Sequence, residues 1–241
     1  MLSPEKLFQI WEAGLDRPPL ARSVAMLRAA GTVHTALDPA AIPIGARDLE
    51  LISLREQAFG RDVNGIAACP ECAERVEIRF DTDDVRQPAA LPSDTLYLES
   101  GGYRVRFHLP SSADLLSIEV VGDEDEDGRR ILERCVSEAT LDGAPISAAT
   151  LPDEMQQAVA GAMAAADPQA EIQLSLECPA CTRRWTELFD IDTFFWTELQ
   201  AWAARLLREI HQLASAYGWS EHEILALPPL RRNTYLNLIA E

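Results

Sequence analysis

The sequence predicts an α+β protein with helical N- and C-terminal parts, a small core divided between two distant segments, and an α+β insertion between those segments. Three observations lead to this fold class. Two similar cysteine motifs, CPEC at 69–72 and CPAC at 178–181, lie far apart in the chain. Alternating apolar residues, the pattern of a β-strand, adjoin each motif. Apolar residues at helical spacing recur in the N-terminal part and in the C-terminal 50 residues.

The composition is that of a soluble globular protein. Of the 241 residues, 47% are hydrophobic and 25% are charged, and the net charge is −18. Such an acidic chain disfavours nucleic-acid binding, which depends on Lys and Arg contacts to phosphates. We expect no membrane segment, because no apolar run approaches the ~20 residues that a spanning helix needs. Glu5 and Lys6 interrupt the apolar pattern of the N-terminus, so we also expect no secretory signal and a cytoplasmic location.

The two cysteine motifs resemble each other beyond their cysteines. C-P-E-C-A-E-R-V and C-P-A-C-T-R-R-W share the proline, an arginine three residues after the second cysteine (Arg75 and Arg184), and a bulky apolar residue next to it. This pattern is typical of two tight turns that each direct two thiolates at one metal ion. Four thiolates make a closed tetrahedral zinc site without an open position for water, which is structural and not catalytic. The predicted zinc ligands are Cys69, Cys72, Cys178 and Cys181. Arg75 and Arg184 could offset the negative charge of the tetrathiolate site.

Three other interpretations of these cysteines stay open, and the simplest is that the four thiols bind no ligand. They could form disulfides, although a cytosolic chain is kept reduced and paired CxxC turns favour metal. They could also form a thiol-disulfide redox site, although such sites use a single CxxC ahead of a helix. The fifth cysteine, Cys135, falls on an expected helix, where a small buried apolar residue is the default interpretation.

The spacing of the motifs determines the expected domain organisation. The 105 residues between Cys72 and Cys178 far exceed the usual gap in a zinc ribbon, so they must contain a domain-sized insertion. We therefore expect a split zinc-ribbon-like core in 67–82 and 171–188, an α+β insertion in 83–170, an N-terminal helical segment in 1–66 and a C-terminal helical segment in 189–241.

Local signals predict the elements of the N-terminal segment and the insertion. Ser3-Pro4 is a helix start and Gly14 a stop; Gly31 and Gly60 end two further helices. In the insertion, apolar residues alternate around Gly101-Gly102 between Leu96 and Phe107, which indicates a hairpin. Leu115, Leu116 and Ile118 suggest a short helix. Longer helices are expected at 128–139 and 151–166.

The C-terminal segment carries the strongest periodic pattern. One apolar stripe marks a long helix that starts near Asp192 and stops at Gly218; its members are Phe195, Leu199, Trp202, Leu206, Ile210, Leu213 and Tyr217. Ser220 and Glu223 form a capping box for a short helix that ends at Pro228, and a last helix carries Tyr235. The candidate partner-binding residues of this segment are Trp202, Tyr217, Trp219, Arg231, Arg232 and Tyr235. The alternative is that its aromatic side chains only pack the helices together.

Other chemical motifs are incomplete. Asp123, Asp125 and Asp127 follow the start of a calcium loop, but its twelfth position is Arg134 and not a bidentate carboxylate. His222-Glu223 begins like a zincin motif, but Ala226 stands where the second histidine belongs. The four histidines have no sequence partner that suggests a catalytic dyad. We therefore expect no enzyme activity.

Three stretches together carry a resemblance to a known family. They are P-I-G-A-R-D-L-E-L-I-S-L-R-E-Q-A-F-G at 43–60, the CPEC/CPAC pair, and the tail pattern L-F-D-I-D-T-F-F-W-T-E-L, R-L-L-R-E-I-H-Q-L-A, Y-G-W-S-E-H-E-I-L-A-L-P and R-R-N-T-Y-L. This combination resembles the baseplate hub assembly chaperones of T-even-type contractile phages, in the form found in bacterial contractile injection gene clusters. The resemblance covers about half of the chain, and the tail is its most specific part.

The resemblance implies a non-enzymatic assembly factor or minor component of a contractile tail baseplate. Its partners would be baseplate hub or spike proteins, and it could become incorporated into a phage-tail-like particle. Two alternatives come from the cysteines: a zinc-ribbon adaptor in a regulatory complex, or a thiol-disulfide redox protein.

Overall fold

The computed structural model describes residues 2–31, 38–88, 95–118 and 122–239. The chain is a mixture of helices and small antiparallel sheets, as the sequence predicts. Among the described helices, including the 27-residue α7, none combines the length and apolar character that crossing a bilayer requires. His34 lies outside the described residues.

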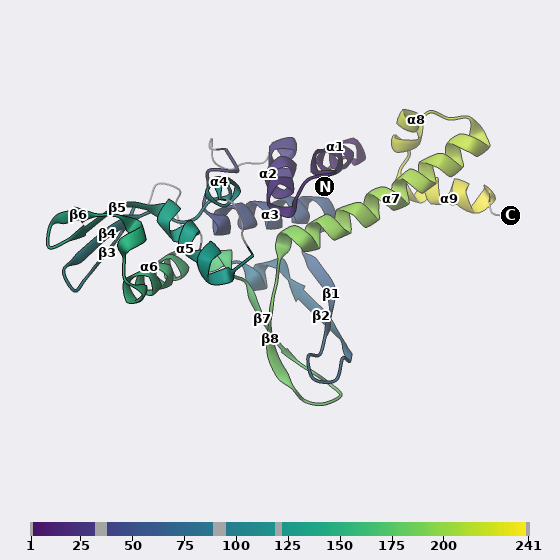
Figure 1. Cartoon of the computed structure of the whole chain (residues 1–241). Coiled ribbons are helices and arrows are strands. Elements are labelled where there is room, and N and C mark those ends of the chain that lie inside the picture. The colour runs from purple at the N-terminus through teal and green to yellow at the C-terminus, as the bar shows by residue number, and fades with distance from the viewer. Residues whose placement is uncertain (1, 32–37, 89–94, 119–121, 240–241) are drawn as a thin grey trace.

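A helical scaffold forms the centre of the molecule (Figure 1). It consists of α1 (Pro4–Gly14), α2 (Pro19–Ala30), α3 (Ile44–Phe59) and the first half of α7 (Ile191–Tyr217), which share one apolar core. The Ser3 hydroxyl accepts a hydrogen bond from the Lys6 amide at the start of α1, and Gly31 ends α2 with a φ of 69°. Both predicted helix boundaries are confirmed.

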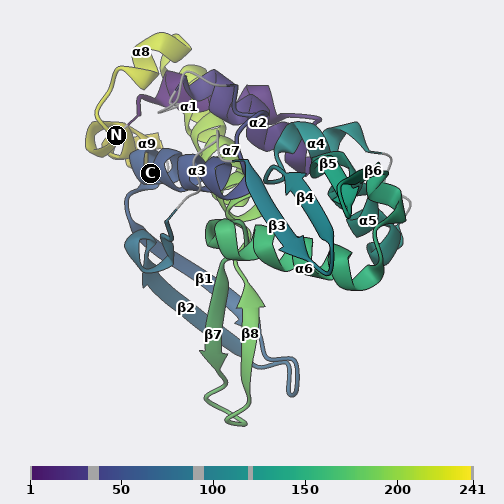
Figure 2. The same ribbon diagram turned by 90° about the vertical axis from the view of Figure 1, so that its left-hand side faces the viewer.

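Two ribbons project from the scaffold (Figures 1 and 2). The first ribbon pairs β1 (Asp62–Ala68) with β2 (Arg75–Asp81), and the second pairs β7 (Gln173–Glu177) with β8 (Arg184–Leu188); both are antiparallel. Each cysteine motif lies in the turn of its ribbon. The sequence indicated β2 and β7 but not β1 and β8, so each motif joins two strands instead of adjoining one.

The insertion is a four-stranded antiparallel sheet packed against two helices. Its strands follow one another in chain order: β3 (Leu96–Ser100), β4 (Tyr103–Phe107), β5 (Val136–Leu141) and β6 (Ala144–Ile146). The helices are α5 (Glu124–Cys135) and α6 (Asp153–Ala166), and a shorter helix, α4 (Ser112–Ser117), links this unit to the scaffold.

The structure confirms the hairpin around Gly101-Gly102 and corrects the helix expected at 128–139. That helix ends at Cys135, and the next residues form β5, which pairs with β4 across a register shift at Arg106 and Phe107. The acidic residues from Asp123 onward belong to α5 and not to a calcium loop, because the Asp123 side chain caps the helix by accepting from the Glu126 amide.

The second half of α7 extends away from the scaffold and carries α8 (Glu221–Leu225) and α9 (Pro229–Ile239) at the end opposite the insertion (Figure 1). A separate apolar cluster joins these helices to α1. Gly218 ends α7 as predicted. The N-terminal cap of α7 is Asp190 and not the predicted Asp192. The Asp190 carboxylate accepts from the amides of Asp192 and Thr193. Asp192 is instead buried in the first turn, 3.7 Å from the Arg22 guanidinium.

Candidate metal centre

The two cysteine turns have the same backbone structure. In the first, the Cys69 amide donates to the Glu74 carbonyl and the Ala73 amide donates to the Cys69 carbonyl, each at 2.9 Å. In the second, the Cys178 and Thr182 amides make the equivalent bonds, also at 2.9 Å. Ala73 and Thr182 both adopt a φ of 59°, so the backbone reverses direction in each turn at the residue after the second cysteine.

The two turns bring the four predicted ligands together across the 105 intervening residues. The Sγ atoms of Cys69 and Cys181 lie 3.6 Å apart, as do those of Cys72 and Cys178, and all four sulfurs lie within 4.8 Å of one another. A tetrahedral zinc site with Zn–S bonds of 2.3 Å has sulfurs separated by about 3.8 Å. A disulfide requires about 2.05 Å. The spacing therefore fits a shared metal ion, and the five cysteines are free thiols.

The cluster is half covered by protein. Cys69 and Cys178 are buried, whereas Cys72 and Cys181 are exposed at the tips of the ribbons. Burial opposes ionisation of Cys69, but backbone amides of Cys72 and Glu71 and the neighbouring thiols outweigh it and lower its pKa to about 7. The Glu74 amide favours the Cys72 thiolate, but crowding by the other sulfurs raises the pKa of Cys72 to about 12. Four close thiolates repel one another, and a divalent cation removes that repulsion.

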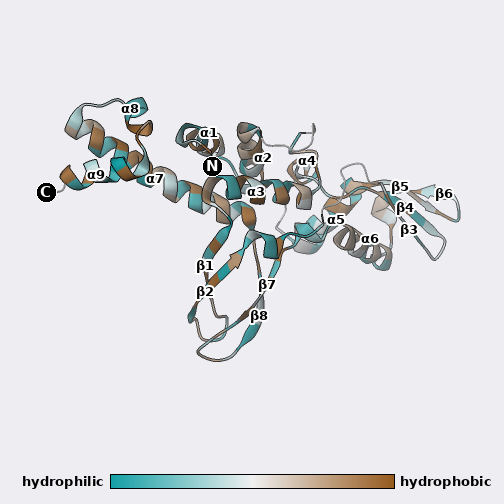
Figure 3. Ribbon diagram, turned by 180° about the vertical axis from the view of Figure 1, so that it is seen from behind, coloured by the Kyte–Doolittle hydropathy of each residue, from teal (hydrophilic) through white to brown (hydrophobic). Residues whose placement is uncertain are grey.

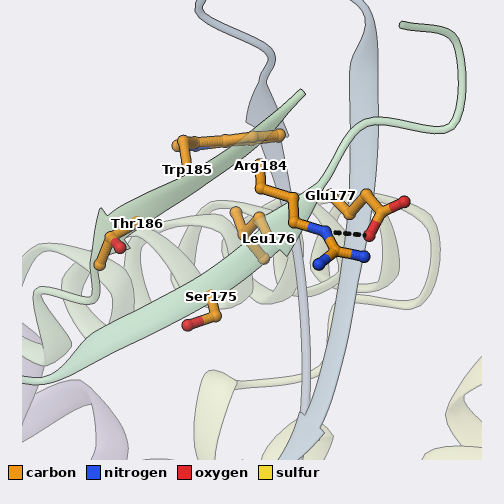
Figure 4. A pocket seen from close by; sticks show the side chains of 6 residues that line it. All are labelled: Ser175, Leu176, Glu177, Arg184, Trp185 and Thr186. Carbon is orange, nitrogen blue, oxygen red and sulfur yellow. Dashed lines mark hydrogen bonds and ion pairs between the residues drawn. The ribbon is translucent and has the colours of Figure 1, made fainter. Parts of the chain in front are cut away.

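The two arginines that follow the cysteine turns lie on the strands β2 and β8. The Arg184 guanidinium donates from Nε to Glu177 Oε2 at 2.7 Å, across the second ribbon (Figure 4). This pair borders an open hollow of about 420 Å³ that Leu176 and Trp185 also line. Arg75 is exposed and pairs in register with Ala68. The exposed Arg75 and the Glu177-paired Arg184 therefore make no ion pair with the cysteine sulfurs among the described contacts.

The bases of the ribbons are held by aromatic rings. Phe80 at the end of β2 and Phe189 after β8 pack edge to face with ring centroids 5.1 Å apart, and Phe189 contacts Phe194 at 5.4 Å. Hydrophobic and hydrophilic segments alternate along β1 and β2 between base and tip (Figure 3). The ribbons are thus joined at their bases by rings and at their tips by the cysteine cluster.

A buried arginine also anchors the first ribbon, and sequence analysis did not identify it. Arg55 on α3 is 2% exposed, and its Nε and Nη2 donate to Glu198 on α7, each at 2.9 Å. The same guanidinium donates to the carbonyls of Gly60 and Asp62, each at 2.8 Å, where β1 begins. No spacing motif marks this set, because its two charges are 143 positions apart.

The candidate partner-binding residues divide into two groups. Tyr217, Trp219 and Tyr235 form one aromatic cluster: the first two rings stack at 4.7 Å, and Tyr235 meets Trp219 edge to face at 4.9 Å. Arg231 nearby in the sequence is exposed. Leu230 and Leu238, 81% and 56% exposed, add apolar surface on α9 that the sequence pattern did not single out.

The other two candidates make contacts within the chain. Trp202 is partly buried, with its ring 5.1 Å from Phe8 on α1. Arg232 is 9% exposed and donates to Glu209 on α7 at 2.8 Å. Trp202 therefore joins α7 to α1, and Arg232 joins α9 to α7.

The chain as a whole is an α+β protein with a four-cysteine cluster and without a membrane-spanning helix in its described part. A family model described as T4 bacteriophage base plate protein matches residues 29–196, more than half of the chain. The protein belongs to this T4 base plate protein family. No curated protein and no solved structure matches it.

The matched region contains both cysteine turns and the insertion, and it ends six residues into α7. The aromatic cluster at the C-terminus lies beyond it. The match supports a role connected with the phage baseplate.

Proposed function

We propose that this protein is a non-enzymatic assembly factor or minor component of the baseplate hub in a contractile tail or injection system. It acts by contact with hub or spike proteins and becomes part of, or works on, a phage-tail-like particle. The observation that carries this proposal is the match to the T4 base plate protein family over residues 29–196.

The aromatic cluster at the end of α7 is the proposed contact surface. Exposed aromatic and arginine side chains dominate the binding energy of many protein interfaces. Tyr217 is 39% exposed, and Leu230 and Leu238 extend the apolar surface beside it along α9. With a net charge of −18, the chain has little affinity for nucleic acid and suits a basic protein surface.

A binding experiment with purified hub and spike proteins of the same baseplate tests this surface. Tyr217→Ala and Arg231→Glu are expected to weaken binding by roughly 30-fold or more, since a central hot-spot residue contributes about 2 kcal/mol or more. The matched controls are Tyr97→Ala and Arg129→Glu, which change exposed residues of the same types on the insertion. Equal binding by all four variants would show that the aromatic cluster is not the contact surface. If the unaltered protein did not bind, hub and spike proteins would not be its partners.

We also propose that the metal at the four cysteines is zinc and that its role is structural. The sulfur-only donor set and the sulfur–sulfur distances of 3.6 Å support zinc. Four sulfur ligands fill a tetrahedral coordination sphere, so no position stays open for a substrate or water. Metal analysis of the untagged protein is expected to show that Cys72→Ser/Cys181→Ser loses one equivalent of zinc per chain. A thiol-disulfide redox protein would instead contain no metal here and would show a reversible two-electron thiol couple.

A further inference from the structure

Three donor groups also meet inside the insertion, away from the four cysteines. They are the imidazole of His108 directly after β4, the carboxylate of Asp114 on α4, and the thiol of Cys135 at the end of α5. Their donor atoms all lie within 4.8 Å of one another. The three residues come from different elements, so no sequence motif predicts the cluster. The sequence suggested only a buried apolar role for Cys135.

The donor types and one measured distance fit a divalent cation of the zinc class. Imidazole nitrogen, carboxylate oxygen and thiolate sulfur are the three kinds of ligand that zinc takes from proteins. His108 Nε2 and Asp114 Oδ2 lie 3.3 Å apart. A tetrahedral ion with metal–ligand bonds of 2.0 Å also separates its ligands by about 3.3 Å.

The burial of the donors makes this an open site. Cys135 is fully buried and Asp114 is 8% exposed, whereas the His108 side chain is 46% exposed. Burial and the charge of Asp114 raise the pKa of Cys135 to about 12. A cation bound to all three groups would keep a fourth position on the His108 side, toward solvent.

Other contacts orient the Asp114 carboxylate and compete for it. Its Oδ2 accepts from the Ser111 amide at 3.0 Å and from the Ser111 hydroxyl at 2.5 Å, which caps α4. Its Oδ1 lies 3.4 Å from Arg134 Nε. The Arg134 side chain is 58% exposed, so it can move into solvent when a cation approaches. The alternative to a metal site is a simple hydrogen bond between His108 and Asp114.

We propose that His108, Asp114 and Cys135 form a second divalent-cation site with three protein ligands and one exchangeable position. The site lies where the insertion meets the scaffold: the Ile44 amide donates to the Pro110 carbonyl at 3.0 Å, and the Ala113 amide donates to the Ala40 carbonyl at 2.7 Å. A cation here links β4 and α5 to α4. Its fourth position accepts water or a donor group from a neighbouring baseplate protein.

Titration of the metal-free, untagged protein with cobalt(II) tests the proposal, because thiolate-to-cobalt charge-transfer absorption reports the number of sulfur ligands. The unaltered protein is expected to bind two equivalents, and the second should add about one quarter of the charge-transfer intensity of the first. His108→Ala and Cys135→Ser should each bind one equivalent with the four-thiolate spectrum. His211→Ala, which changes an exposed histidine on α7, should still bind two.

The variant Cys72→Ser/Cys181→Ser separates this site from the four-cysteine site. It should lose the four-thiolate spectrum and keep one equivalent with single-thiolate intensity. His108 is half exposed, so its alanine variant is expected to fold normally, which circular dichroism checks. The proposal is overturned if the unaltered protein binds one equivalent, or if His108→Ala and Cys135→Ser both still bind two.

Discussion

The insertion and the pair of ribbons both lie between α3 and α7, but different forces hold them together. The insertion has its own core of ten buried residues, built around Phe107 and Val159. The ribbon strands bury only Val63 and Ala67 among their described residues. Two-stranded ribbons cannot exclude enough water to be stable alone. The comparison teaches that a cysteine cluster at the tips and anchors at the base take the place of apolar burial where the sheet is too small.

The largest expected effect is at the tips of the ribbons. Removing the metal with a strong chelator, or changing Cys72→Ser/Cys181→Ser, should release both ribbons, because a structural zinc ion contributes on the order of 10 kcal/mol. Hydrogen exchange should accelerate in β1, β2, β7 and β8 and stay slow in the insertion strands. Ser175→Ala/Thr186→Ala, which changes exposed ribbon residues, should leave exchange unaltered. Simultaneous loss of protection in the insertion would show that the two regions are not held independently.

The next effect is at the base of the first ribbon. Arg55→Met should lower the free energy of unfolding by about 3–5 kcal/mol, because it leaves Glu198 and two carbonyls without their buried partner. Arg79→Met is the matched control, since Arg79 pairs with Glu77 on the ribbon surface and is 74% exposed. Its expected cost is under about 1 kcal/mol. Urea denaturation measures both, and equal costs would contradict the anchoring role of Arg55.

A titratable group at the base of the insertion should give a pH-dependent effect. Burial raises the pKa of Asp48 from 3.8 to about 6, and Arg47 opposes this only in part. Arg47 Nη1 also donates to Ser112 Oγ on α4, at 3.3 Å. The folded state therefore holds the Asp48 proton more tightly than the unfolded state. The stability from this group is fully present below pH 3.8 and is lost as the pH rises through 6.

Asp48→Asn removes this dependence. The free energy of unfolding of the variant minus that of the unaltered protein should rise by on the order of 3 kcal/mol between pH 4 and pH 7. Loss of the Arg47 partner adds a cost that does not vary over this range, because arginine stays charged. Urea denaturation at a series of pH values measures the difference. A difference that stays constant with pH would show that Asp48 titrates normally in the fold.

The smallest expected effect is steric. A Cβ on Gly45, in the first turn of α3, would lie 2.9 Å from the Ala170 amide and would overlap the Asp167 carboxylate. Asp167 Oδ2 accepts from the Gly45 amide, so the same contact joins the insertion to α3. Gly45→Ala should cost about 1–3 kcal/mol. Gly161→Ala on α6 meets nothing within 4 Å and should stabilise by about 0.5–1 kcal/mol. Thermal unfolding measures the change in stability of both variants. A change of the same sign in both would contradict the close contact between Gly45 and Asp167.

Sequence patterns anticipated much of the fold where signals were local or repeated. The cap at Ser3, the hairpin at Gly101-Gly102 and the stop at Gly218 were predictable, since each depends on a few neighbouring residues. The meeting of the four cysteines was predictable because the two turns have similar sequences. β8 was missed because Arg184 to Leu188 is mostly exposed and its pairing with β7 creates the strand.

Other features depend on contacts between distant parts of the chain. Arg55 and Glu198 carry no local sign of their pairing, and the cluster of His108, Asp114 and Cys135 assembles from three elements without a motif. Asp190 and Asp192 are equally plausible caps by sequence. The sequence analysis chose Asp192, whereas in the fold Asp190 accepts the helix amides and Asp192 is buried beside Arg22.

The position of the cysteine turns has a mechanical consequence. They lie at the far ends of β1 and β8, the strands that continue into α3 and α7. With a metal bound, tension that pulls α3 away from α7 passes from one turn to the other through metal–sulfur bonds and bypasses residues 73–177. The share of the load that passes through the metal does not pass along the chain of the insertion. The insertion can change conformation while the two scaffold helices are under tension.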